Sequence, residues 1–136
     1  MMMSIEYVNW LAVVLAALSS FLLGGLWYSP LLFQKTWMLE CGLTELDLEK
    51  SNVKITFGGA FVLTIIGSLM LAIVLGPEPQ LGKSVLTGLM IGVFWVSTSF
   101  GVSYLFEQRS LKLFVVNSGY HVLQFVLMGL VIGGIS

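Results

Sequence analysis

Four polar side chains in one otherwise apolar stretch could do chemistry. Asn117, Tyr120, His121 and Gln124 stand at intervals of three and four residues, so on an α-helix they share one face. His121 is the one histidine of the sequence, and imidazole titrates near neutral pH. We call these four residues the polar seam, and they are the candidate ligand-binding residues.

The polar seam has three interpretations. It can hold helices together through hydrogen bonds to backbone carbonyls or to the hydroxyls of other stretches. It can bind a small ligand or ion, or relay protons, around His121. A metal site is the third interpretation, and one histidine with one cysteine supplies too few donors for it. The candidate hydroxyls for the first interpretation are Ser19, Ser20, Thr98 and Ser99.

The composition shows what surrounds this seam. Hydrophobic residues make up 57% of the 136 residues and charged residues only 10%, against about 25% charged in a soluble domain. A soluble domain of this length has too small an interior to bury so much apolar surface, so lipid must cover it. The formal net charge is −1 and no basic patch is present, which excludes nucleic-acid binding. The single cysteine, Cys41, excludes an internal disulfide.

Four uncharged stretches are long enough to cross the hydrocarbon core, which takes about 20 residues. No Lys or Arg precedes the first stretch, so we expect a retained span and no secretory signal. Trp95 lies in the middle of the third stretch, away from the interfaces where tryptophan is enriched, so we expect it to pack inside the bundle. The stretches are residues 7–28, 55–75, 84–106 and 113–135.

Residues 30–52 separate the first two stretches and are predicted to form a surface segment. Proline suits the first turn of a helix and glycine often ends one, so we expect an amphipathic helix from Pro30 to the residue before Gly42. Thr44 and Asp47 have the spacing of a capping box, which predicts a second short helix. Both helices should lie along the membrane surface.

Small residues recur every four positions in each stretch, and such stripes let helix backbones approach closely in lipid. We expect the stripes to pack the helices into a compact bundle and to join copies of the chain in a homo-oligomer. They are Ala12, Ala16, Ser20 and Gly24; Ala60, Thr64, Ser68, Ala72 and Gly76; Ser84, Gly88 and Gly92; and Gly129 and Gly133.

No Asp, Glu, Lys or Arg lies within the four stretches. Proton pumps, ion-coupled carriers and small multidrug exporters usually place a carboxylate in the membrane, because coupling needs a group that changes charge. This class is therefore disfavoured. Enzyme signatures are also absent: the sequence has no phosphate-binding loop, no zinc-binding His/Glu pair and no serine with an acid-base partner at hydrolase spacing. We expect a non-enzymatic protein without a metal or cofactor.

Three segments together carry a family resemblance. The first is Asn-Trp-Leu-Ala-Val at 9–13. The second is Gly-Gly-Leu-Trp-Tyr-Ser-Pro-Leu-Leu-Phe at 24–33, followed by Lys35 and Trp37. The third is Leu-Lys-Leu-Phe at 111–114, leading into Asn-Ser-Gly-Tyr-His at 117–121 and Met-Gly at 128–129. In this order and spacing they resemble the domain-of-unknown-function 1761 (DUF1761) family, which implies a small multi-span protein of the bacterial cytoplasmic membrane with no assigned activity.

We therefore predict an all-α membrane protein with a single domain over residues 1–136, in which four transmembrane helices form a compact bundle and a short amphipathic segment joins helices one and two. The predicted function is that of a non-enzymatic, oligomeric structural or regulatory membrane component. Its predicted partners are membrane lipids and copies of itself, and no protein partner is identified. The alternative is a passive channel or carrier for a small solute, lined by the polar seam.

The Lys and Arg residues predict the orientation in the membrane. Five of the six lie in the segments after stretches one and three, and the other side of the membrane has Lys83 alone. Because Lys and Arg favour cytoplasmic loops, both termini should face outward. With Cys41 replaced and single cysteines introduced at Ser4, Asn52 or Ser136, an impermeant thiol reagent should label intact cells only at the first and last positions. Labelling of Asn52→Cys would overturn this orientation.

Overall fold

The computed structural model describes residues 4–135, and within this range every regular element is a helix. Four helical spans are long and apolar enough to cross a membrane, so the predicted fold class is confirmed. The first and second are α1 (Trp10–Trp27) and α4 (Val53–Leu75). The third, Leu81–Phe106, is built from α5, a π-helical segment and α6, and the fourth is α7 (Leu111–Ile135).

Capping side chains set where the first two spans begin, and the observed starts differ from the predicted boundaries. α1 begins at Trp10, later than predicted, because the side chain of Asn9 accepts a hydrogen bond from the backbone N–H of Ala12 at 3.2 Å. Tyr7 ends a short 3₁₀ turn, Ile5–Tyr7, outside the span. Asn52 caps α4 in the same way, and the third and fourth spans begin at Leu81 and Leu111.

The surface segment contains two short helices, α2 (Gln34–Cys41) and α3 (Glu45–Lys50). The prediction that Pro30 opens the first of them was wrong, because the chain turns first, with the N–H of Leu32 bonded to the carbonyl of Ser29 at 3.0 Å. Gly42 ends α2 with a φ of 70°, as predicted.

The predicted capping box of α3 is present. The Thr44 side chain accepts from the N–H of Asp47, and the Asp47 carboxylate accepts from the N–H and the hydroxyl of Thr44, both at 2.9 Å. These hydrogen bonds lower the pKa of the Asp47 carboxyl. The start of this short helix is therefore fixed by its own sequence.

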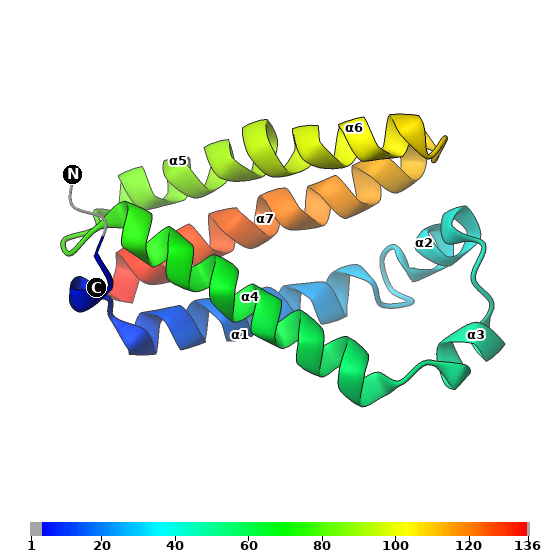
Figure 1. The fold of residues 1–136 in the computed structure, drawn as a ribbon, viewed down its shortest axis with the longest axis horizontal. Helices are drawn as coiled ribbons and strands as arrows, with labels where there is room; N and C mark the ends of the chain where they lie inside the picture. The colour runs from blue at the N-terminus through cyan, green and yellow to red at the C-terminus, as the bar shows by residue number, and fades with distance from the viewer. Residues whose placement is uncertain (1–3, 136) are drawn as a thin grey trace.

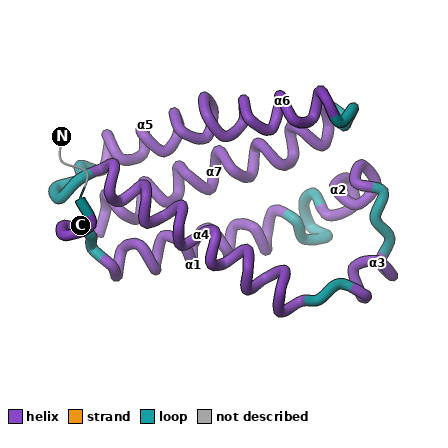
Figure 2. The backbone as a smooth tube through the Cα atoms, viewed as in Figure 1, coloured by secondary structure: helices purple, strands orange, loops and turns teal. Residues whose placement is uncertain are grey.

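The spans are not arranged as four equivalent helices. Figure 1 shows α7 lying between α1 on one side and α5 with α6 on the other, while α4 crosses α1 and diverges from the bundle toward α3. Figure 2 shows that α2 and α3 are joined to each other and to α1 and α4 by loops. Helices α2 and α3 lie at the end of the bundle opposite the chain termini (Figure 1). The side of the membrane that each end faces stays a prediction, and Ser136 lies outside the described residues.

The backbones of α5 and α7 touch at glycines from both helices. A Cβ atom at Gly92 would lie 2.7 Å from the Cα of Val122, and one at Gly88 would overlap the carbonyl oxygen of Phe125. On α7, a Cβ at Gly129 would overlap the carbonyl oxygen of Ser84 in α5. The prediction that Gly88 and Gly92 lie at a helix–helix contact is confirmed. The partner face comes from the glycine stripe of α7, within the same chain.

The small-residue stripe of α1 also packs against helices of the same chain. Ala12, Ala16 and Ser20 are fully buried. On α4, the buried hydroxyl of Ser68 donates to the backbone carbonyl of Val13 at 2.9 Å. The described core lies where these stripes meet α7 and is formed by Ala12, Val13, Ala16, Leu71, Ala72, Met128 and Ile132.

A π-helical segment, Gly92–Ser97, interrupts the third span between α5 (Leu81–Ile91) and α6 (Thr98–Phe106). A π turn bonds across five residues, so side chains no longer follow the α-helical spacing. The prediction that Trp95 packs inside the bundle was wrong, because Trp95 is 71% exposed while Gly92 is buried against α7. The hydroxyl of Ser97 donates to the Gly92 carbonyl at 2.7 Å.

Replacing Gly92 with Leu should prevent the close contact of the third span with α7, because the side chain has no space beside Val122. We expect the melting temperature of the detergent-purified protein to fall sharply, by the equivalent of about 1–3 kcal/mol or more for an overpacked interior. Gly82→Leu is the matched control in α5, since no atom lies within 4 Å of a Cβ there. Equal melting temperatures for the two variants would contradict this contact.

Two buried serines should respond differently to alanine. Ser68→Ala removes a hydrogen bond between α4 and α1 and should cost about 0.6–1.7 kcal/mol of unfolding free energy. Ser84→Ala should be neutral or stabilising, because the buried Ser84 hydroxyl has no hydrogen-bond partner among residues 4–135. Unfolding in sodium dodecyl sulfate measures the unfolding free energy of both variants. A larger loss of stability for Ser84→Ala than for Ser68→Ala would refute this assignment of the two hydroxyls.

Candidate functional site

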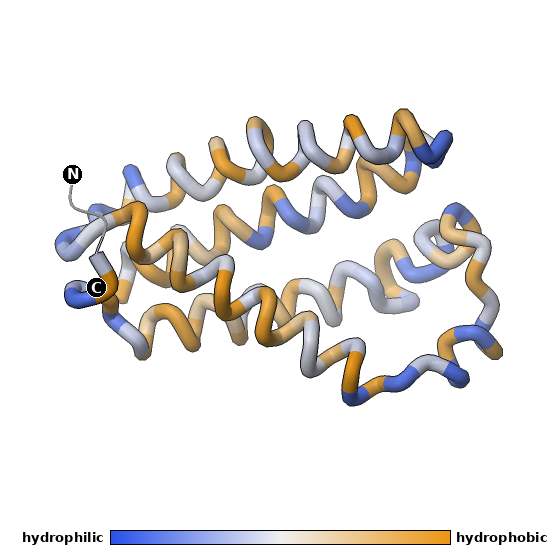
Figure 3. Tube along the Cα trace, viewed as in Figure 1, coloured by the Kyte–Doolittle hydropathy of each residue, from blue (hydrophilic) through white to orange (hydrophobic). Residues whose placement is uncertain are grey.

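The polar seam lies along α7 where this helix meets α1 and α6. Gln124 is buried, with 5% of its surface exposed, and Asn117, Tyr120 and His121 are half-buried. In Figure 3 the same helix carries blue, hydrophilic turns within its length, whereas most of the other long helices are orange or pale there. The seam is thus a polar strip inside an otherwise apolar bundle.

Asn117 joins three helical segments through its amide. Its Oδ1 accepts from the hydroxyl of Tyr28, the residue that follows α1, at 2.7 Å. Its Nδ2 donates to the hydroxyl of Tyr104 on α6, also at 2.7 Å. Both ends of the amide are therefore bonded to protein, and the two bonds fix α1 and α6 against α7.

Tyr120 makes the second junction with α1. Its hydroxyl donates to the backbone carbonyl of Ser20 at 3.2 Å and lies 3.4 Å from the hydroxyl of the same residue. The Nε2 of Gln124 donates to the Tyr120 hydroxyl at 3.4 Å. Gly24 makes this approach possible, because a Cβ there would lie 3.1 Å from the Tyr120 oxygen.

His121 is held by its own helix. Its Nδ1 lies 2.7 Å from the Oε1 of Gln124, and since a carbonyl oxygen only accepts, Nδ1 carries the hydrogen. Nε2 of the neutral ring is then an acceptor, and no bond to it is found within residues 4–135. The ring stacks on Phe100 of α6, with centroids 5.1 Å apart and planes inclined by 29°.

The sequence pattern predicts a hydrogen bond from His121 to another span or to a trapped water; in the structure its Nδ1 bonds to Gln124 on the same helix, and the bond to a water stays a prediction. Three of the four hydroxyls proposed as partners bond elsewhere. Ser19, Thr98 and Ser99 donate to carbonyls within their own spans, at 2.7 Å in each case. Of the four hydroxyl residues, only Ser20 contacts the seam, through Tyr120. Short-range bonds to the preceding turn satisfy a serine or threonine hydroxyl without any partner helix.

The second and third sequence segments used for the family resemblance contact each other. Besides the bond from Tyr28 to Asn117, the indole Nε1 of Trp27 donates to the carbonyl of Val116 at 2.9 Å. A Cβ at Gly119 would lie 3.1 Å from the Trp27 ring. The glycine in Asn-Ser-Gly-Tyr-His therefore leaves space for the tryptophan of the other motif.

Sequence reasoning missed several members of this network. Tyr28, Tyr104 and Phe100 were not among the candidate residues. The sequence signal that could have found Tyr28 and Tyr104 is a tyrosine at the end of a span when another span carries an uncharged polar residue.

Trp37 of α2 extends the aromatic cluster, with its ring centroid 5.7 Å from that of Tyr28. Burial raises the pKa of the nearby Cys41 thiol, an effect larger than the opposing influence of Arg109.

Comparisons with known proteins agree with the sequence pattern. A family model described as "Protein of unknown function (DUF1761)" matches residues 11–133, nearly the whole chain. No significant match is found among the curated proteins or among the solved structures. The matched range includes both motifs that meet at Tyr28 and Asn117. The chain is therefore a member of the DUF1761 family.

Proposed function

We propose that this protein is a non-enzymatic structural or regulatory component of the bacterial cytoplasmic membrane that works as a homo-oligomer. The observation that supports a structural role most directly is the state of the polar seam. The Asn117 amide is bonded at both ends to side chains of other helical segments, whereas the Gln124 amide bonds to two side chains of its own helix. Polar groups bonded as Asn117 is tie helices together in lipid.

Among the small-residue stripes, the one that leaves exposed surface for contact between copies is that of α4, in the first half of the helix. The stripes on α1, α5 and α7 are buried within the chain, so they are not free for a partner. Every residue from 53 to 60 is exposed, and a Cβ at Gly58 or Gly59 would meet no atom within 4 Å. We therefore place the contact between copies on this part of α4, which diverges from the bundle in Figure 1.

Cysteine cross-linking in native membranes tests this contact. In a Cys41→Ser background, Gly59→Cys should yield a dimer with a short bismaleimide, because closely packed small residues bring two copies together. Leu22→Cys on α1 is the matched control, since this 76% exposed position lies on another helix. Equal cross-linking at the two positions, or none at Gly59, would argue against this oligomer.

A passive channel or carrier for a small solute is the second candidate function. One observation favours it: the Nε2 of His121 is an acceptor with no bond found within residues 4–135. Under the structural proposal, vesicles containing the protein should swell in water, glycerol or urea no faster than empty vesicles. Faster swelling that His121→Leu abolishes and His121→Gln retains would replace the structural proposal with the channel.

The structural role also predicts an order among seam variants. Asn117→Leu removes two bonds between helices and should cost about 1–3 kcal/mol of unfolding free energy. His121→Leu removes a bond within α7 and should cost less, under about 1 kcal/mol. Unfolding in sodium dodecyl sulfate measures both values. The reverse order would contradict the assignment of Asn117 as the principal junction.

A further inference from the structure

The turn between α6 and α7 holds a charged pair in a defined direction. Gln108 adopts a left-handed conformation, with a φ of 58°, at a position where helices usually end in glycine. The N–H of Arg109 bonds to the carbonyl of Tyr104 at 2.9 Å, and that of Gln108 to Leu105 at 3.3 Å. These two bonds are those of a common left-handed helix end, so the turn has a defined backbone geometry.

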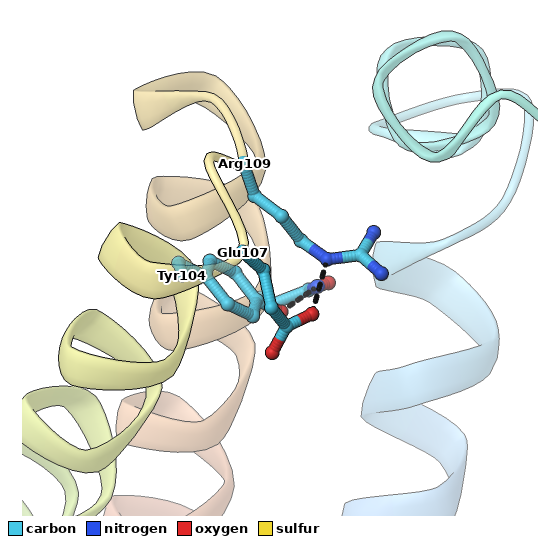
Figure 4. A network of polar contacts seen from close by, with 4 residues as sticks. Tyr104, Glu107 and Arg109 are labelled. Atoms are coloured by element: carbon cyan, nitrogen blue, oxygen red, sulfur yellow. Dashed lines mark hydrogen bonds and ion pairs between the residues drawn. The ribbon is translucent and has the colours of Figure 1, made fainter.

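The Arg109 guanidinium is only partly used by the protein. Its Nε donates to the Oε1 of Glu107 at 2.9 Å, and its centre lies 6.0 Å from the centroid of the Tyr104 ring. Figure 4 shows the two terminal nitrogens pointing away from the turn that carries Arg109. No bond from these nitrogens is found within residues 4–135, and the same holds for the second carboxylate oxygen of Glu107. The turn between α6 and α7 therefore carries a cationic and an anionic group, each with atoms that can still bond to a ligand.

Exposed apolar residues flank this charged pair in the sequence. Leu105, Phe106 and Leu111 are 81%, 86% and 76% exposed. They mark the end of the third span and the start of the fourth, where hydrocarbon meets the headgroup region. A ligand that fits this corner has acyl chains on one side and charged groups on the other.

We propose that the α6–α7 corner, residues 104–111, binds a phospholipid whose headgroup carries both a phosphate and a primary ammonium. The terminal nitrogens of Arg109 match phosphate oxygens in a two-pronged hydrogen bond. The free carboxylate oxygen of Glu107 accepts from the ammonium. A headgroup with phosphate alone leaves Glu107 beside like charge, and a trimethylated ammonium has no hydrogen to donate. This site goes beyond the proposed function.

Native mass spectrometry of the detergent-purified full chain tests the site. Phosphatidylethanolamine is offered in pairwise competition with phosphatidylglycerol and with phosphatidylcholine of the same acyl chains. We expect phosphatidylethanolamine to be retained about fivefold better than either, the size of one good partly exposed ion pair. Soluble phosphoethanolamine should compete poorly, because it lacks the acyl chains that cover Phe106 and Leu111.

Two variants give opposite expectations for the competing lipids. Arg109→Gln should lower the binding of all three phospholipids. Glu107→Gln should remove the preference for phosphatidylethanolamine and raise the binding of phosphatidylglycerol. Lys83→Gln, in α5, is the control and should change nothing. If Arg109→Gln does not fold, as shown by its melting profile, Glu107→Gln decides the question.

Four outcomes would overturn the site. The first is equal retention of the three lipids by the unmodified protein, and the second is better retention of phosphatidylglycerol. The third is an unchanged preference in Glu107→Gln. Competition by soluble phosphoethanolamine at the level of the whole lipid would also overturn it, because the acyl chains would then contribute nothing.

Discussion

The contact of the α5 and α7 backbones is the constraint on which the rest of the structure depends. Neither Gly88 nor Gly129 has space for a Cβ, so the helices meet at a distance that side chains would prevent. Lipid tails are as apolar as leucine, and burial of apolar surface alone does not bring helices together in a membrane. Close van der Waals contact does, and glycine on both helices maximises it. α7 is thereby placed between α5 and α1.

The polar seam adds direction to this packing. In hydrocarbon an unsatisfied polar group costs several kcal/mol, so a helix carrying Asn117 must present it to donors and acceptors on its neighbours. The bonds to Tyr28 and Tyr104 are made at one register of α1 and α6 against α7. A rotation of α7 would leave both hydroxyls and the amide unpaired. Glycine contacts set how close the helices lie, and the seam sets how they are rotated.

The π segment lets the third span meet two requirements at once: the close glycine contact with α7 and the contact with the polar seam. Gly92 must face Val122, and eight residues later Phe100 must face His121. The hydroxyls of Ser97, Thr98 and Ser99 bond to carbonyls of the segment at Gly92, Phe94 and Trp95. The same change of phase turns Trp95 toward the outside. The serine and threonine run is therefore explained by the backbone of its own span.

The sequence by itself determined the four spans, the small-residue stripes, the αL end of α2 at Gly42 and the capping box of α3, because each follows from local composition or spacing. The candidate residues of the seam were likewise found from one helical face. Only the tertiary structure decided which groups they contact. Tyr28 and Asn117 are separated by 89 positions, and no local pattern pairs a tyrosine with one amide among several polar groups. Trp95 was misassigned because a π turn changes the angle between successive side chains, and this change arises where two backbones meet.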